Sequence, residues 1–362
     1  TLLLINTYYI QFLYSTIETN LLFNSINFMN KILVTGAGGF IGSQLVEELL
    51  KRKFKVRAFF KYSSSNNLGW LQENKNKNLE TIHGDISDYD SVVEAFKGIN
   101  IVFNLAALIS VPYSFKNPES FIQTNVDGLI NVLRASRQNK KNIKRIIQIS
   151  SSEVYGNSIN SKIKVLKENL KLRSESPYAA SKIAADHLAI TSFRSHGTPI
   201  VVARPFNTFG PRQSLRAVIP TIISQFINTN NKKIMIGNLE SSRDFVYVKD
   251  TVDGLIKLMD SGKVIGEVIN ISSNNSYSIK NIIEMLSKYT KSKPQIVVQQ
   301  KRKRTSELNK LRGSNEKIYK LAKWKPKYAS KENFSKALIE TYKWFSEPKN
   351  LKNYQDLNKY HI

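Results

Sequence analysis

Three hydroxyls and a carboxylate follow directly after the apolar run RIIQI, in the segment SSSEVYG at residues 150–156. If RIIQI is a buried strand, then Ser151, Ser152 and Glu153 lie at its carboxyl end, where open α/β sheets bind their ligands. A carboxylate at such a place can take a proton from a bound substrate. The alternative is that Glu153 caps the next turn or is solvated.

A tyrosine and a lysine stand four residues apart in the next motif, SPYAASKIAADHL. On a helix, Tyr178 and Lys182 share one face. A lysine ammonium near a phenol lowers the pKa of the phenol, and so does a nicotinamide cation, which makes Tyr178 a candidate base near neutral pH. The same spacing occurs in surface pairs, but the neighbouring motifs favour the catalytic interpretation.

A glycine-rich loop, TGAGGFIGS, follows the first apolar run and opens a helix that we expect to run to about Lys51. In such loops one glycine permits the tight turn, one lets the backbone approach a pyrophosphate, and one allows close packing of helix on strand. The helix N-terminus favours the anion. The loop predicts a dinucleotide site formed by Gly36, Gly39, Phe40, Ile41 and Gly42.

The end of the second strand usually carries an acidic residue that bonds the adenosine ribose. Phe60 and Lys61 stand there instead. Lys61 could accept the extra phosphate of NADP or be solvated, so NAD is the predicted cofactor and NADP stays open. Asp85, followed by Ile86 in HGDI, is predicted either to contact the adenine or to cap the following helix.

Short apolar runs rich in β-branched residues alternate with longer helical patterns along the chain. This alternation predicts an α/β fold, a Rossmann-type doubly wound parallel sheet with helices on both faces. The predicted strands are 31–35, 56–60, 80–82, 101–105, 145–149, 200–204 and 268–271. The remaining segments predict a smaller carboxyl-terminal substrate lobe, which forms a cleft with the strand ends.

The composition narrows the function classes. The chain has 362 residues and no cysteine, and its four histidines show no metal-ligand spacing, so we expect no metal site. The net charge of +26 would suit nucleic acid or an anionic membrane, but no basic block interleaved with aromatics stands out. A small anionic substrate is the preferred interpretation, with no nucleic acid and no membrane as partners.

Residues 1–28 precede Met29 and lack both the basic leader of a signal peptide and the roughly 20 apolar residues of a membrane span. We expect an upstream extension of unknown role and a cytoplasmic location.

Taken in order, these motifs resemble the extended short-chain dehydrogenase/reductase family. The resemblance runs from Met29 to about residue 345 through TGAGGFIGS, NLAAL, SSSEVYG, YAASK, RPFNTFGPR and RDFVYVKD. In NLAAL it assigns Leu105, Ala106 and Ala107 to the cofactor site. ALISVPYSF and RPFNTFGPRQSLRAVIPTII most resemble the nucleotide-sugar 4,6-dehydratases of the legionaminic-acid pathway, which act on a nucleotide-activated N-acetylglucosamine.

The resemblance implies a reaction that converts UDP- or GDP-N-acetylglucosamine to its 4-keto-6-deoxy product. Tyr178 and Lys182 match the residues that serve the oxidation at carbon 4, and Ser151 the residue that bonds the oxygen on carbon 4. Glu153 matches the base that removes the carbon 5 proton as the carbon 6 hydroxyl leaves. Ser152 replaces the acid of the glucose dehydratases, so the proton donor is open, with Glu153 as base and acid and Ser152 orienting the hydroxyl as one solution.

The substrate side of the resemblance is carried by four residues. Asn207 and Arg243 match contacts to the nucleotide diphosphate, and Arg302 a late arginine that here precedes Lys303 rather than proline. Val218 lies in the segment that surrounds the base. From the residues alone, Arg243 could instead form an ion pair with Asp244 or Asp250.

The resemblance also implies a homodimer. The helix that contains Asn125 and the helix that contains YAASK pack, in relatives, against their copies in a four-helix bundle. The predicted organisation is an extension at 1–28, a dinucleotide-binding domain at 29–203 plus 243–271, a nucleotide-sugar-binding lobe at 204–242 plus 272–345, and a tail at 346–362.

Two other functions stay open on this scaffold. One is carbon 4 epimerisation or decarboxylation of a nucleotide-linked uronic acid. Glu153 disfavours a simple epimerase, which needs no base at carbon 5. The other is a non-catalytic dinucleotide-binding regulator, because a fold alone does not guarantee turnover.

Overall fold

The computed structural model describes residues 30–157, 163–228, 233–299, 311–351 and 354. Arg302 and the extension at 1–28 lie outside the described residues. No helix within the described ranges is long and apolar enough to span a bilayer.

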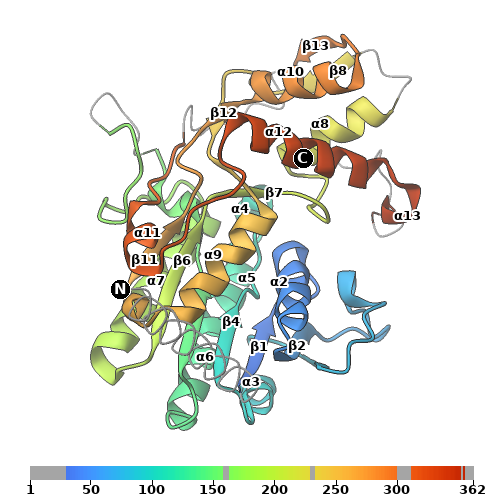
Figure 1. Ribbon diagram of the computed structural model, residues 1–362. Helices are drawn as coiled ribbons and strands as arrows, with labels where there is room; N and C mark the ends of the chain where they lie inside the picture. The colour runs from blue at the N-terminus through green and yellow to red at the C-terminus, as the bar shows by residue number, and fades with distance from the viewer. Residues whose placement is uncertain (1–29, 158–162, 229–232, 300–310, 352–353, 355–362) are drawn as a thin grey trace, which may run out of the picture.

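Seven strands form one sheet in the order β11-β6-β5-β4-β1-β2-β3 (Figure 1). Every neighbouring pair is parallel. The doubly wound parallel sheet predicted from the sequence is confirmed, and each strand lies within two residues of its predicted bounds. The strands are β1 (Lys31–Thr35), β2 (Lys55–Lys61), β3 (Leu79–Gly84), β4 (Ile101–Asn104), β5 (Arg145–Ile149), β6 (Ile200–Pro205) and β11 (Val268–Ile271).

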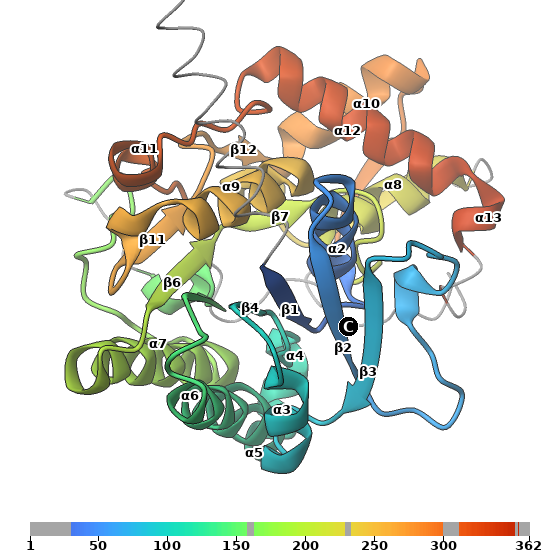
Figure 2. The same ribbon diagram turned by 60° about the horizontal axis from the view of Figure 1, so that its bottom comes forward.

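Both faces of the sheet are buried, which explains the nearly continuous apolar runs. Ile32 and Val34 of β1 point into a core shared with α2 (Phe40–Lys51) and α9 (Val248–Asp260). Leu33 points the other way, into a core shared with three more helices. Those helices are α3 (Tyr89–Phe96), α6 (Gly128–Gln138) and α7 (Pro177–His196). Figure 2 shows α6 and α7 side by side on one side of the sheet and α2 and α9 on the other.

The helix α7 has clear sequence signals at both ends. The Ser176 hydroxyl accepts a hydrogen bond from the backbone N–H of Ala179, Pro177 occupies the first turn, and Gly197 ends the helix in the left-handed conformation. Upstream, the short helices α4 (Val111–Lys116) and α5 (Pro118–Ile122) lead into a π-helical turn at Gln123–Asp127 that continues as α6.

The second lobe begins where β6 ends, so it lies at the carboxyl end of the sheet. It contains three two-stranded pairs and the helices drawn at the top of Figure 1. The pairs are β7 (Asn207–Phe209) with β10 (Phe245–Tyr247), β8 (Lys233–Ile236) with β13 (Gln295–Val298), and β9 (Ser242–Arg243) with β12 (Tyr277–Ser278). The helices are α8 (Val218–Ile227), α10 (Ile279–Thr290), α12 (Lys331–Ser346) and α13 (Pro348–Leu351).

Two late segments return to the first domain. The helix α11 (Glu316–Ala322) packs against β11 and α9, and the Ser261 hydroxyl donates to the Leu321 carbonyl at 2.7 Å. Tyr354 lies 5.6 Å from the Trp70 ring, and its hydroxyl donates to the Gln213 carbonyl at 2.8 Å. Tyr354 therefore contacts both lobes.

Candidate active site

The glycine-rich loop turns sharply between β1 and α2. Gly36 has φ +65°, and a Cβ added there would lie 2.9 Å from the Ala106 backbone nitrogen. A Cβ on Gly42 would lie 2.2 Å from the Gly36 carbonyl oxygen. The fold itself therefore requires these two glycines, one for its backbone conformation and one for close packing.

Gly39 differs, because the fold does not require it. Its φ of −77° suits any residue, and a Cβ there would have one close neighbour, the Gly36 carbonyl oxygen at 3.3 Å. Gly39 precedes α2, whose N-terminus has no side-chain cap. The space beside Gly39 and the uncapped N–H groups fit a pyrophosphate, so Gly36, Gly39 and Gly42 with Phe40 and Ile41 would hold a dinucleotide here.

The variant Gly39→Ala separates binding from folding. We expect its free energy of unfolding to stay within about 1 kcal/mol of wild type, because the added methyl group meets one atom closely, the Gly36 carbonyl oxygen, which has to shift by only a few tenths of an ångström. We also expect its affinity for the nicotinamide dinucleotide to fall at least tenfold, roughly the effect of 1.4 kcal/mol. Urea denaturation and calorimetric titration measure the two effects. Gly36→Ala is the comparison, and it should unfold more easily. Equal dinucleotide affinity in Gly39→Ala and wild type would contradict this account.

At the adenosine end, the side chains of Lys61 and Asp85 pair at 3.5 Å. Partial burial favours the neutral acid, but hydrogen bonds from Ser87 and the charge of Lys61 prevail and lower the pKa of Asp85. The cap of α3 is Asp88, which accepts the Ser91 backbone N–H. The expectation that Asp85 might cap this helix is therefore wrong, and its contact with adenine stays a prediction.

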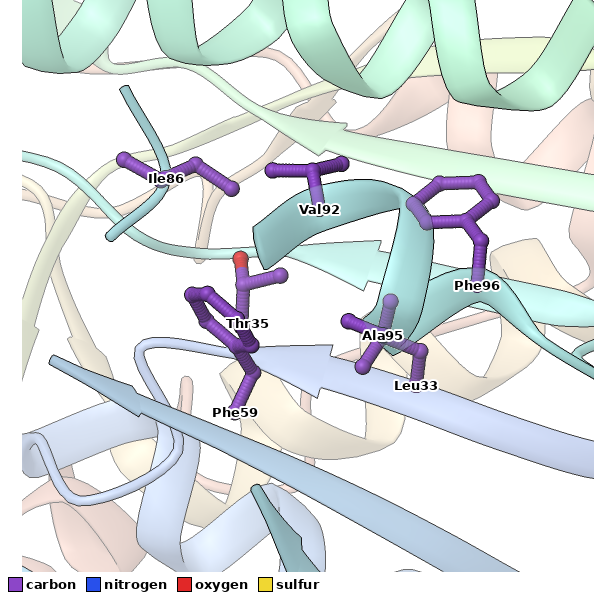
Figure 3. Close-up of a pocket in the computed structure, with 7 residues that line it drawn as sticks. All are labelled: Leu33, Thr35, Phe59, Ile86, Val92, Ala95 and Phe96. Carbon is purple, nitrogen blue, oxygen red and sulfur yellow. The ribbon is translucent and has the colours of Figure 1, made fainter. Parts of the chain in front are cut away.

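The side chain of Ile86 packs into the core rather than standing open at the strand ends. It lines a small gap between the sheet and α3 (Figure 3). The rest of the lining is apolar except for the hydroxyl of Thr35. That hydroxyl donates to Asn104 at 2.7 Å and accepts the backbone N–H of Ala106 at 3.0 Å. The gap is packing space. Ile86 is 5% exposed, and its carbonyl accepts the Asn131 side chain at 3.1 Å, so its contact with a cofactor stays a prediction.

The segment after β4, Leu105 to Ala107, is held in place by Asn125. The Asn125 side chain accepts the Leu108 backbone N–H at 2.9 Å and donates to the Leu108 carbonyl at 3.1 Å. It also donates to the Ser181 hydroxyl at 2.9 Å. Ser181 precedes Lys182, so this buried amide fixes the predicted cofactor strand end against the predicted catalytic helix.

Tyr178 and Lys182 lie on one face of α7, as predicted, and both are buried. The Lys182 Nζ donates to the Ile149 carbonyl at the end of β5, at 2.9 Å. Burial raises the pKa of Tyr178 to about 12, with Ser151 lowering it by a hydrogen bond and the Glu153 and Asp186 carboxylates raising it. The prediction that Lys182 lowers this pKa is wrong for the protein alone, because desolvation outweighs any effect of the ammonium.

The buried lysine makes stability depend on pH. Burial lowers the pKa of Lys182 to about 8 from its ordinary 10.5, with the Asp186 carboxylate acting in the opposite direction. Between these pH values the unfolded chain keeps the proton and the folded chain does not, so the free energy of unfolding rises with pH across that window. At about 1.4 kcal/mol per pKa unit, the rise is up to about 3 kcal/mol.

Lys182→Met should remove this rise, because the variant has no proton to release. Urea denaturation at pH values on either side of 8 measures it. Lys51→Met, at the exposed end of α2, is the control and should keep the wild-type dependence. Parallel curves for wild type and Lys182→Met would contradict the assignment.

The turn that carries the acidic residue faces α7. Ser151 caps a 3₁₀ turn at Ser152–Tyr155, and its hydroxyl accepts the Glu153 backbone N–H at 3.2 Å. Ser152 is buried, while Glu153 is half-buried. The Ser151 side chain lowers the pKa of the Tyr178 phenol, and the Glu153 carboxylate raises it. The structure thus brings Ser151, Glu153 and Tyr178 together, as their spacing in the sequence did not guarantee.

The predicted substrate residues lie at the start of the second lobe. The register pairs Asn207 of β7 with Phe245 of β10, two residues after Arg243. The Asn207 Nδ2 is buried and has no hydrogen-bond partner. A buried amide with an open donor is costly without a ligand, so Asn207 fits a site for phosphate oxygens. Val218 is 37% exposed at the start of α8.

The ion pairs considered for Arg243 do not form. Asp244 accepts from Ser273, Asn274 and Gly313. Asp250 accepts the backbone N–H groups of Lys327 and Tyr328. Asp244 joins separate segments and thereby fixes the backbone next to Arg243. Asp250 lies on α9, which packs on the sheet, and it ties that helix to the segment before α12.

Sequence reasoning missed Asp186 and the role of Arg204. These two form a buried ion pair with a distance of 2.9 Å between Arg204 Nε and Asp186 Oδ2. The sequence did contain a signal for this ion pair. Asp186 follows Lys182 by four residues on the buried face of α7, and Arg204 is a charged residue near the end of an apolar strand.

Comparisons with known proteins show to which family the chain belongs. A family model described as GDP-mannose 4,6 dehydratase matches residues 33–337. The dTDP-D-glucose 4,6-dehydratase of Dictyostelium discoideum is 33% identical over 271 residues, which are 70% of this chain and only 60% of that relative. The UDP-N-acetyl-alpha-D-glucosaminuronate decarboxylase of Bacillus cytotoxicus is 32% identical over 277 residues, 74% of this chain and 82% of that protein. The human dTDP-D-glucose 4,6-dehydratase is 30% identical over 343 residues, 92% of this chain and 94% of that protein.

Two solved structures of similar proteins contain a bound nucleotide sugar or NAD. The UDP-N-acetylglucosamine 4-epimerase from Methanobrevibacter ruminantium, in complex with UDP-N-acetylmuramic acid, has a TM-score of 0.77 and 32% identity over 88% of this chain and 98% of its own. The dTDP-glucose 4,6-dehydratase from Bacillus anthracis, in complex with NAD, has a TM-score of 0.74 and 26% identity over 88% of this chain and 97% of its own. The chain belongs to the GDP-mannose 4,6-dehydratase family, within the extended short-chain dehydrogenase/reductases that comprise the NAD-dependent epimerases and dehydratases.

Proposed function

We propose that the protein is a nucleotide-sugar 4,6-dehydratase that converts UDP- or GDP-N-acetylglucosamine to the 4-keto-6-deoxy sugar. The observation that supports this most is that the turn of Glu153 lies at the phenol of Tyr178. The Ser151 hydroxyl accepts the Glu153 backbone N–H at 3.2 Å, and both side chains act on the pKa of Tyr178, Ser151 lowering it and Glu153 raising it. Elimination needs a base at carbon 4 and a second base at carbon 5. Epimerisation at carbon 4 needs no base at carbon 5.

The chain's residues divide the reaction between them. The phenolate form of Tyr178, which the charge of a nicotinamide cation would favour, takes the proton of the carbon 4 hydroxyl, and Ser151 bonds the oxygen at that carbon. When bound, a nicotinamide dinucleotide would supply the redox chemistry, as the acceptor for the hydride of carbon 4 and its donor at carbon 6. Glu153 removes the carbon 5 proton, which the 4-keto group has acidified, and protonates the carbon 6 hydroxyl as it leaves as water. Ser152 orients that hydroxyl. Carbon 5 takes up a proton at the end, which is balanced by the proton that Tyr178 took from the carbon 4 hydroxyl.

Asn207 and Arg243 bind the nucleotide diphosphate in this proposal. The Asn207 Nδ2 is buried without a hydrogen-bond partner, which supports a role for this amide in binding phosphate oxygens. An arginine fork suits phosphate oxygens because it is bidentate and always charged. Arg302 and Val218 complete the nucleotide site by resemblance.

A substrate panel read by mass tests the function. With UDP- and GDP-N-acetylglucosamine, the proposal predicts a product lighter by one water. A product of unchanged mass would indicate carbon 4 epimerisation, and loss of carbon dioxide from the matching uronic acid would indicate a decarboxylase. No turnover, together with steeply salt-dependent DNA binding, would favour a regulator.

We propose NAD as the cofactor. Lys61, which could otherwise accept the extra phosphate of NADP, pairs with Asp85 at 3.5 Å. Calorimetric titration with both dinucleotides tests this, and tighter binding of NADP would contradict it.

We further propose that the product enters a legionaminic-acid type of surface polysaccharide synthesis in the cytoplasm. This proposal rests on the resemblance of ALISVPYSF and of the segment after Arg204.

We also propose a homodimer formed through α6 and α7. Apolar side chains stand exposed beside these helices, including Ile122 at 45% and Ile130 at 36%. Light scattering should give twice the chain mass for wild type and the single chain mass for Ile130→Asp. Tyr62→Asp, at an exposed aromatic residue outside these helices, is the control.

A further inference from the structure

One buried guanidinium connects the two elements of the proposed catalytic centre. Arg204 lies near the end of β6 and is 3% exposed. Its Nε donates to the Asp186 carboxylate on α7 at 2.9 Å. Its Nη1 donates to the Tyr155 hydroxyl at 3.0 Å, and the Tyr155 ring centroid is 5.0 Å from the guanidinium carbon.

Each partner belongs to an element with a proposed chemical role. Asp186 lies one helical turn after Lys182 and two turns after Tyr178 on the buried face of α7. Tyr155 closes the 3₁₀ turn that holds Ser152 and Glu153. The guanidinium therefore connects the helix of the phenol to the turn of the carboxylate.

The neighbouring strand fixes the Tyr155 side of this link. Asn270 of β11 lies opposite Arg204 in the register and accepts the Tyr155 hydroxyl at 2.7 Å. The Asn270 side chain donates to the Leu166 carbonyl at 3.1 Å, and its backbone N–H donates to Glu168 at 2.9 Å. Tyr155 and Asn270 thus each bond a further element, which fixes the Tyr155 side of the link. On the other side, Asp186 Oδ2 accepts from Arg204, while the buried Asp186 Oδ1 has no hydrogen-bond partner.

We propose that Arg204 is a positioning residue for the loss of water, which fixes the Glu153 carboxylate relative to Tyr178 by holding Tyr155 and Asp186 together. This inference rests on the proposed dehydratase function. The two ends of the link differ in their other supports. The phenol helix is also fixed to the sheet by Lys182 and to the strand end after β4 by Asn125. The link reaches the turn at Tyr155, two residues after Glu153, but reaches the helix at Asp186, two turns after Tyr178, so loosening the link displaces Glu153 more than Tyr178.

Two substitutions test the link. Tyr155→Phe keeps the ring and removes the hydroxyl, and Arg204→Lys keeps a charge but has no fork to reach both partners. A misplacement of about 1 Å costs roughly 100-fold in rate, so we expect water loss to slow by about 10- to 100-fold in both variants. Oxidation at carbon 4, read as near-ultraviolet absorbance of the reduced nicotinamide, should change much less.

Arg145→Lys is the matched control. Arg145 is also a buried arginine, 7% exposed, but it lies at the opposite end of the sheet and donates to the carbonyls of Leu258 and Ser261. The Arg145→Lys variant should lower the free energy of unfolding without changing the ratio between the rate of water loss and the rate of oxidation at carbon 4. An equal loss of both steps in the Arg204 and Tyr155 variants, or the same change of ratio in Arg145→Lys, would overturn the proposal.

A measurement without substrate separates this inference from the proposed function. In urea denaturation, the effects of Tyr155→Phe and Asp186→Asn on the midpoint should be non-additive, because both act through Arg204. Additive effects would overturn the link itself. Non-additive effects in a protein whose wild type releases no water would instead overturn the dehydratase assignment and leave the link standing.

Discussion

Glu153→Gln should stop the release of water while leaving oxidation at carbon 4 detectable. The amide cannot take the carbon 5 proton, and loss of a positioned base costs about 10² to 10⁴ in rate. Glutamine keeps the size of the side chain, so Tyr178 keeps its surroundings. Mixing enzyme, NAD and substrate should therefore give reduced nicotinamide absorbance that persists, with no product lighter by one water.

Glu175→Gln is the control for this experiment. Glu175 is a carboxylate close to the same turn, but it pairs with Arg173 at 2.8 Å. Its variant should release water at close to the wild-type rate. Normal water release by Glu153→Gln would remove Glu153 from the reaction.

Tyr178→Phe should abolish both steps, because without the phenol no group takes the carbon 4 hydroxyl proton. We expect a loss of about 10² to 10⁴ in the rate of cofactor reduction, the usual contribution of a general base. The fold should persist, since the ring keeps its edge contact with Phe121 at 6.2 Å. Stopped-flow absorbance of the nicotinamide measures the rate, and circular dichroism the fold.

A variant in the second lobe controls for removal of a hydroxyl alone. Tyr289→Phe changes a partly exposed tyrosine whose ring lies 5.5 Å from Tyr342. It should reduce the cofactor at the wild-type rate. Near-normal cofactor reduction by Tyr178→Phe would exclude the phenol as the base.

The sheet and the face shared by Tyr178 and Lys182 were predictable from local patterns. Strands buried on both sides leave apolar runs that need no knowledge of the rest of the chain, and a spacing of four on a helix defines a shared face. The glycine loop was predictable for the same reason, because the positive φ of Gly36 and the close approach at Gly42 are local requirements.

What could not be predicted depends on residues far apart in the chain. The pKa of Tyr178 is raised by burial and by the carboxylates of Glu153 and Asp186. The spacing of residues along a helix indicates neither how deeply the phenol is buried nor which carboxylates lie near it. The Arg204 link joins positions 155, 186 and 204 from three elements. The strands of the second lobe, such as β9 with two residues, are too short to show a period.

The most direct test uses a nucleotide-activated N-acetylglucosamine labelled with deuterium at carbon 4. If the phenol and the carboxylate act on the same bound sugar, the label should appear at carbon 6 of a product that has lost one water. Label that returns to carbon 4 of a product of unchanged mass would contradict the account.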